Sequence, residues 1–195
     1  MTLPSTRLLY SGLVLLVASE RLIELVISGR HVRLLLARGG YEVDPDQYPV
    51  MVTFHTLFLA ACPAEVFLAG RPFLPPLGGP MLALLAAATA LRWWATRTLG
   101  ERWSTRVVVV PGAPPVTGGP YALVRHPNYL ALVAEVLALP LVHTAWVTAL
   151  AGTALNAALL RRRIRVEEEA LAAAGGYREA FGETPRFVPG RRRGE

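Results

Sequence analysis

Long apolar runs separated by short polar segments dominate the pattern of this chain. Five runs are candidates for helices that cross or enter a bilayer: residues 8–27, 50–69, 79–99, 128–140 and 144–160. A straight span needs roughly 20 apolar residues, so the fourth run is short for one. We expect it to form a tight hairpin with the fifth run, with Pro140 and His143 at the turn. The pattern predicts an all-α, polytopic transmembrane helix bundle with about five spans.

Composition agrees with a membrane protein and limits the other classes. Only 17% of the 195 residues are charged, whereas soluble domains carry roughly 25% charged residues. We expect one domain, 1–195, in which residues 1–99 supply the N-terminal spans and residues 100–190 supply the functional half. The single Cys62 excludes an internal disulfide and a multi-cysteine metal site. No metal is expected, because the histidines lack the i, i+4 pairing of zinc helices: His31, His55, His126 and His143.

Arginine accounts for all 20 basic residues and clusters beside the apolar runs. This placement points to membrane orientation and not to nucleic-acid binding. With residues 161–165 in the cytoplasm, the arginine-rich loops 30–48 and 100–127 fall inside and the loop 71–78, which holds only Arg71, falls outside. We therefore expect an integral membrane protein whose functional face is cytoplasmic. The small size of the chain and its lack of lysine are typical of a bacterial protein, so the membrane is expected to be a bacterial cell membrane.

Two segments near the C-terminal half differ from the spans. The run 107–110 consists of four valines and is followed by a segment rich in Pro and Gly, which predicts a loop pressed against the bundle. Residues 161–183 carry Glu and Arg at helical spacing. They predict a cytoplasmic helix that continues from the fifth run and is interrupted at Gly175 and Gly176.

The densest polar clusters are residues 119–130 and 161–169. Polar groups at the mouth of a membrane segment are costly unless they are paired or face a cavity, so we interpret the two clusters as one site. Arg163 and Glu167 lie four residues apart and share a helix face, as do Arg165 and Glu169 on another face. Solvated ion pairs on a cytoplasmic helix are the alternative, and the spacing does not decide which arginine faces the site.

Charged residues also occur inside the apolar runs. Glu20, Arg21 and Glu24 lie in the first run, and they are either a buried structural pair or part of a substrate cavity. Glu135 lies in the fourth run, and His55 in the second run is expected to form a hydrogen bond between helices.

The ordered motifs of the C-terminal half resemble the isoprenylcysteine carboxyl methyltransferase family. The resemblance covers roughly residues 100–190 and rests on Gly119-Pro120-Tyr121, Arg125-His126-Pro127-Asn128-Tyr129, Arg163-x-x-x-Glu167-Glu168-x-x-Leu171, Tyr177 and Pro185-Arg186. It implies a cytoplasm-facing pocket for S-adenosyl-L-methionine. By position, Tyr121, His126, Pro127, Asn128 and Tyr129 would contact this cofactor. A loop of Ala113, Pro114, Pro115 and Val116 would cover the cofactor, and Glu167 would meet its charged end. Arg163 would orient the acceptor as the catalytic residue, with Glu168 also binding the substrate.

The implied reaction is transfer of a methyl group to an oxygen of a lipophilic acceptor. Candidate acceptors are a carboxylate, or the hydroxyl of a phenol or pyrone, on a long-chain or isoprenoid compound. A carboxylate is already ionised at pH 7, and Arg163 stays protonated and can bind it with two hydrogen bonds. Two alternatives remain open: a phospholipid or amine N-methyltransferase, and a membrane scaffold without activity. The sequence does not indicate an oligomeric state.

Overall fold

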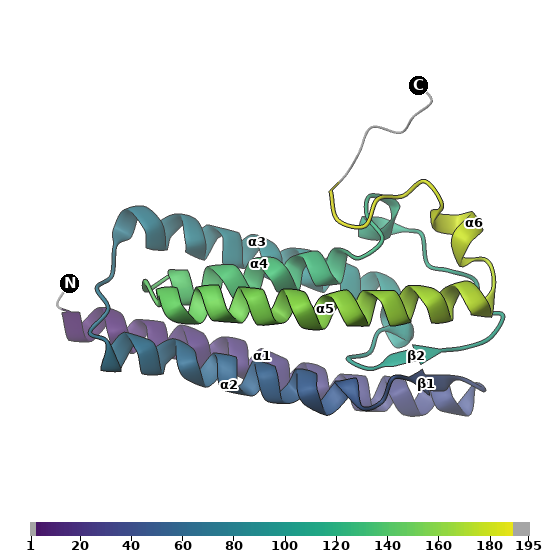
Figure 1. Ribbon diagram of the computed structural model, residues 1–195, viewed down its shortest axis with the longest axis horizontal. Coiled ribbons are helices and arrows are strands. Elements are labelled where there is room, and N and C mark those ends of the chain that lie inside the picture. The colour runs from purple at the N-terminus through teal and green to yellow at the C-terminus, as the bar shows by residue number, and fades with distance from the viewer. Residues whose placement is uncertain (1–2, 189–195) are drawn as a thin grey trace, which may run out of the picture.

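Six α-helices and a two-stranded sheet make up the computed structural model, which describes residues 3–188. Helices α1 to α5 run along the long axis of the molecule, with α1 and α2 side by side and α4 beside α5 (Figure 1). Their bounds are α1 Leu3–Ala37, α2 Gln47–Leu68, α3 Pro75–Leu99, α4 Pro127–Leu141, α5 Trp146–Ala174 and α6 Tyr177–Phe181. Short 3₁₀ turns occur at Gly100–Arg102 and Gly119–Ala122. The sheet and α6 lie at the same end of the bundle (Figure 1).

Every apolar run of the sequence falls on one of the helices α1 to α5, which confirms the mostly α-helical class. Pro140 and His143 lie where α4 ends and turns toward α5. Within the described residues, α2 is the one helix that is both long and apolar enough to cross a membrane, and α4 is a shorter apolar helix. Five spans therefore stay a prediction.

The expected loop 30–48 is partly wrong, because α1 continues as a helix to Ala37. A helix of 35 residues is roughly 52 Å long and exceeds the roughly 30 Å hydrocarbon core. Strand β1 (Tyr41–Val43) follows it and pairs antiparallel with β2 (Val107–Val109), with Tyr41 opposite Val109. The sequence prediction missed this pairing, although it correctly placed the valine run against the bundle, since Val107 and Val109 are buried.

Helix α4 is the centre of the bundle and packs against both α3 and α5, while α2 packs against α1 and α5. The main core joins α2 to α4 through Phe54, Phe58, Leu132 and Val136. Gly152 allows α5 to approach α2 closely, because a Cβ atom there would lie 2.9 Å from the Phe58 ring. These contacts fix the position of α5, whose charged second half carries much of the candidate site.

Helix α5 continues without a break through the charged residues 161–169 and ends at Ala174. Gly175 and Gly176 both have positive φ, of 100° and 75°, a conformation that side chains other than glycine rarely adopt. The helix is therefore interrupted there, as the sequence predicted, and α6 packs back toward the bundle, which the sequence did not indicate.

Candidate functional site

A cavity of about 290 Å³ lies at the end of the bundle that carries the sheet and α6. The candidate residues from both polar clusters meet in its wall, together with the Pro-rich loop: Ala113, Pro114, Pro115, Val116, Tyr121, His126, Asn128, Tyr129, Arg163 and Glu167. Pro127 does not line this cavity, which we call the end cavity, and occupies the first turn of α4. Glu168 does not line it either.

The Tyr129 hydroxyl connects the two polar clusters. It accepts a hydrogen bond from Arg163 Nε at 2.8 Å and donates one to Glu167 Oε2. Arg163 and Glu167 share a helix face, as their spacing predicted, and Tyr129 bridges them. A second nitrogen of Arg163, Nη2, donates to the Thr105 carbonyl oxygen at 2.7 Å. The guanidinium is therefore held in one orientation by a side chain of α4 and by the backbone of the loop before β2.

Burial separates the two candidate arginines. Arg163 is 6% exposed, whereas Arg165 and Glu169 are exposed on the outer face of α5. The alternative of solvated ion pairs thus suits the positions of Arg165 and Glu169 but not that of Arg163. Among the described residues that line the end cavity, Glu167 carries the sole carboxylate.

His126 precedes α4 and lies against Tyr129, with the two ring centroids 5.3 Å apart. Its Nε2 donates to Glu168 at 3.0 Å, and Glu168 also receives two hydrogen bonds from Arg186. Partial burial acts to raise the pKa of the Glu168 carboxyl, but the bonds from Arg186 and His126 outweigh it and hold that pKa below its ordinary value. In the structure Glu168 thus fixes His126 and the C-terminal segment rather than facing a cavity.

Helix α6 forms one side of the end cavity through Tyr177 and Phe181, and the segment 182–188 that follows it is bonded to the chain just before α4. The backbone N–H groups of Arg125 and His126 donate to the carbonyl oxygens of Pro185 and Arg186, at 2.9 and 3.2 Å. Tyr177 and Phe181 of α6 pack on Tyr121. Burial and the charge of Glu167 raise the pKa of the Tyr121 hydroxyl. The sequence analysis did not predict that Phe181 lines the end cavity. A single aromatic residue in a short helix does not indicate which part of the protein it packs against.

The segment 103–105 forms a partition held by α1. Ser28 Oγ accepts from the Thr105 N–H at 2.9 Å, and His31 Nδ1 donates to the Trp103 carbonyl oxygen at 2.7 Å. These bonds place the Thr105 carbonyl that receives Arg163. None of these contacts was predicted, since α1 and the segment are more than 70 residues apart in the chain.

A second cavity of about 330 Å³ lies on the other side of this partition, between α1, α2 and α4. We call it the inter-helix cavity. It shares five residues with the end cavity: Trp103, Ser104, Asn128, Tyr129 and Arg163. Many of its remaining wall residues are apolar, and one of them, Leu22, is 64% exposed on the outer face of α1. Two ligands could therefore meet at Arg163 and Tyr129, one of them in a mainly apolar chamber.

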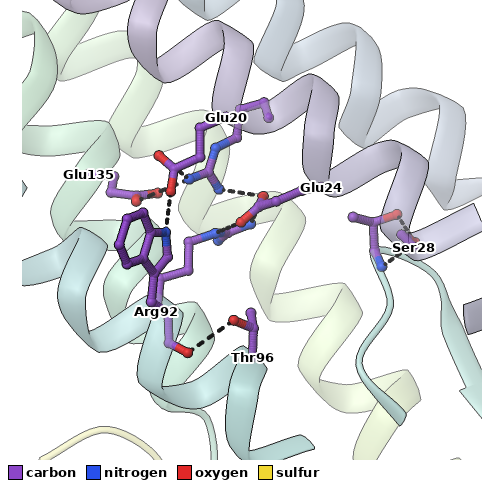
Figure 2. A network of polar contacts seen from close by, with 9 residues as sticks. Glu20, Glu24, Ser28, Arg92, Thr96 and Glu135 are labelled. Carbon is purple, nitrogen blue, oxygen red and sulfur yellow. Dashed lines mark hydrogen bonds and ion pairs between the residues drawn. The ribbon is translucent and has the colours of Figure 1, made fainter. Parts of the chain in front are cut away.

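A buried network of charges borders the inter-helix cavity (Figure 2). Arg92 of α3 donates from Nε and Nη2 to the two oxygens of Glu24, both at 2.7 Å. Arg21 pairs with Glu24 at 2.8 Å and with Glu20 and Glu135 at 3.4 Å. The charges in the first apolar run are therefore paired, and Arg21 and Glu24 also line a cavity; that this cavity holds the substrate stays a prediction. Their main partner, Arg92, was not identified from the sequence.

Residues 3–188 contain no group of three or more His, Cys, Asp or Glu side chains that could hold a metal ion. His55 does not form the expected bond between helices; its Nδ1 donates to the Met51 carbonyl of its own helix at 2.7 Å. The free thiol of Cys62 is fully buried.

Comparison with known proteins gives one family and two relatives. The model of the isoprenylcysteine carboxyl methyltransferase (ICMT) family matches residues 81–173. The uncharacterized protein YpbQ of Bacillus subtilis (strain 168) is 34% identical over 160 residues, which cover 82% of this chain and 94% of that protein. An uncharacterized protein of Haemophilus influenzae (strain ATCC 51907 / DSM 11121 / KW20 / Rd) is 29% identical over 154 residues, covering 77% of this chain and 88% of that protein.

Proposed function

Because the chain belongs to the isoprenylcysteine carboxyl methyltransferase family, we propose that it transfers a methyl group from S-adenosyl-L-methionine to an oxygen of a lipophilic acceptor. Membership in this family indicates a membrane methyltransferase. The identity of the cofactor and the oxygen acceptor are what we propose beyond it. The observation that carries it is the pair of cavities that share Arg163 and Tyr129. One cavity suits the methyl donor and the other suits an apolar acceptor.

The end cavity has the chemistry that the donor requires. S-adenosyl-L-methionine supplies a sulfonium cation with an activated methyl group, joined to an amino acid and an adenosine. Glu167 offers a carboxylate to the ammonium group of the amino acid part, a charge that S-adenosylhomocysteine also carries. Asn128 lines this cavity, and its buried Oδ1 has no hydrogen-bond partner in the described part of the chain. The apolar wall of Val107, Val109 and Leu171 suits the adenine ring.

Arg163 is the residue that we propose orients the acceptor. Its guanidinium faces the junction of the cavities and keeps its charge, so it can hold a carboxylate or a developing phenolate by hydrogen bonds. Methyl transfer is an in-line displacement, and correct positioning can supply roughly 7–11 kcal/mol of such a barrier. Tyr129 and the Thr105 carbonyl fix the guanidinium, so the orientation exists before the acceptor binds.

The same guanidinium argues against the alternative of an amine acceptor. A nitrogen acceptor becomes a cation as it takes the methyl group, and it would do so beside a fixed positive charge in a site of low dielectric constant. An oxygen acceptor loses negative charge or a proton instead, which Arg163 tolerates. We propose that the charged end of the bundle, with residues 161–169, faces the cytoplasm, where the methyl donor is made.

Binding of S-adenosylhomocysteine to the detergent-purified protein tests the proposal first. We expect micromolar affinity by calorimetry, or roughly −8 kcal/mol. Glu167→Gln should weaken it at least tenfold and His126→Ala should weaken it less, whereas Glu169→Gln, exposed on the same helix, should leave it unchanged. Transfer of labelled methyl groups to long-chain phenols and carboxylic acids then identifies the acceptor. Absence of binding by the folded wild type would refute the donor site and favour the scaffold alternative.

A further inference from the structure

One face of α1 carries polar side chains in the second half of the helix. Glu24, Ser28 and His31 follow each other at intervals of four and three residues, so they share that face. Figure 2 shows Ser28 further along α1 than Glu24, and Ser28 is only 2% exposed. Helix α1 has 35 residues, which is more than the roughly 20 that a membrane span needs. A buried hydroxyl needs a hydrogen-bond partner, and the partner of Ser28 shows what this part of α1 holds.

Both Ser28 and His31 hold the segment 103–105. Ser28 Oγ accepts a hydrogen bond from the Thr105 N–H at 2.9 Å and forms a second one with Thr105 Oγ1 at 2.8 Å. His31 Nδ1 donates to the Trp103 carbonyl oxygen at 2.7 Å, and its ring meets the edge of the Trp103 ring, with the centroids 6.4 Å apart. The segment is therefore attached to α1 on both sides of Ser104.

Thr105 connects this attachment to Arg163. Its N–H and hydroxyl bind Ser28, and its carbonyl oxygen accepts from Arg163 Nη2 at 2.7 Å. The Nε atom of Arg163 binds the Tyr129 hydroxyl at 2.8 Å. A planar guanidinium that is held at Nε alone can still tilt, whereas bonds at two nitrogens fix its plane. The second bond depends on Ser28, because the Thr105 N–H without Ser28 loses its partner and the segment shifts to find another.

We propose that Ser28 and His31 are positioning residues for the methyl transfer, which fix the Arg163 guanidinium by holding the segment 103–105. The inference rests on the proposed function, because it names what orients the acceptor-binding group of that site. Neither side chain lines either cavity, and both lie outside the family-matched stretch 81–173. Loss of either hydrogen bond leaves the groups that face the ligands in place and lowers the fraction of molecules in which Arg163 is correctly oriented.

Ser28→Ala, with Ser19→Ala as the matched control, tests the inference. Ser19 lies on the same helix, and its hydroxyl donates to the Leu15 carbonyl oxygen of that helix. Transfer of labelled methyl groups to meta-pentadecylphenol is measured with the purified protein, beside calorimetry with S-adenosylhomocysteine. We expect Ser28→Ala to lower kcat by at least about fivefold, the effect of one weakened hydrogen bond, while the affinity for S-adenosylhomocysteine stays within about twofold. Ser19→Ala should change neither quantity.

The guanidinium itself gives a second measurement that needs no acceptor. In protein labelled with ¹⁵N-arginine, the Nη1 and Nη2 signals of Arg163, assigned with Arg163→Lys, stay separate while the bond to Thr105 hinders rotation about Nε–Cζ. We expect Ser28→Ala to raise the rate of exchange between the two signals by at least about tenfold. His31→Leu should raise it too, and His31→Asn, which keeps an N–H donor near the position of Nδ1, should restore most of the wild-type value.

Three results would overturn the inference. They are an exchange rate that Ser28→Ala leaves unchanged, an equal fall of kcat in Ser19→Ala, and a fall of donor affinity in parallel with kcat, which indicates general damage to the fold. The exchange rate decides the inference whether or not this phenol is an acceptor. Failure of the proposed function would instead appear as absence of S-adenosylhomocysteine binding by the wild type, which is measured separately in the same samples.

Discussion

Removing one oxygen from Tyr129 tests how the site holds its arginine. The substitution Tyr129→Phe keeps the ring that stacks on His126 and deletes the hydroxyl between Arg163 and Glu167. Arg163 keeps its bond to the Thr105 carbonyl, so it stays in the site but loses one of its two fixed contacts. We expect a loss of methyl transfer that exceeds the loss of methyl-donor binding.

The size of the effect follows from the bond that is lost. A hydrogen bond to a charged group contributes about 1.5–3 kcal/mol, which corresponds to a fall of roughly 10- to 150-fold in kcat/KM when that bond serves the transition state. Glu167 loses a donor as well, but its carboxylate remains in the end cavity. Affinity for S-adenosylhomocysteine should therefore fall by less than about fivefold, or roughly 1 kcal/mol.

Tyr41→Phe is the control for this measurement. Tyr41 lies in strand β1, is 45% exposed and lines neither cavity. The same chemical change there should leave kcat/KM within twofold. Steady-state rates with labelled methyl donor, measured beside calorimetry, give both quantities. If Tyr129→Phe keeps more than half of the wild-type rate, or if Tyr41→Phe loses as much, the bridge has no part in orienting Arg163.

Three further outcomes follow from the structure. Arg186 and His126 hold the pKa of Glu168 below its ordinary value of about 4.3. The stability that the ionised carboxylate adds is therefore complete above that value and is lost as the pH falls through the lower folded-state pKa. The difference in unfolding free energy between wild type and Glu168→Gln should shrink on acidification from pH 7 to pH 3, and a constant difference would contradict this. Glu24→Gln breaks a buried ion pair and should destabilise the protein by about 3 kcal/mol, seen as a lower Tm in detergent; an unchanged Tm would show that the pair with Arg92 adds no stability. Gly119→Ala places a Cβ atom 2.6 Å from Thr98 Oγ1 at a φ of 56° and should lower the unfolding free energy by at least about 1–2 kcal/mol, whereas a neutral result would refute the tight packing of this turn.

Local pattern explains what was predictable in the fold. Apolar runs located the helices α1 to α5, because burial of long apolar stretches leaves the helix as the simplest way to pair the backbone. The end of α1 and the strand pair were not predictable. Three-residue strands are too short to show an alternating pattern, and Tyr41–Val43 finds its partner more than 60 residues away.

In the candidate site, too, features within one helix were predictable and contacts between distant segments were not. Spacing placed Arg163 and Glu167 on one face of a helix, and the structure adds that Arg163 is buried and Arg165 is not. The spacing in the sequence could not reveal Tyr129 as the residue between Arg163 and Glu167, nor Arg92 as the partner of Glu24. Both contacts depend on how separate helices pack. The orientation of Glu168 toward Arg186 likewise depends on where the C-terminal segment returns.

The inter-helix cavity draws much of its wall from α1 and α2, which precede the family-matched stretch 81–173. The end cavity draws much of its wall from within that stretch. Under the proposed function, recognition of the acceptor and handling of the methyl donor would therefore be encoded in largely separate portions of the chain. Changes in residues 18–59 would then alter the acceptor while the donor half stays unchanged. For the same reason, exchanging the first two helices between relatives is a route to new methylated lipids.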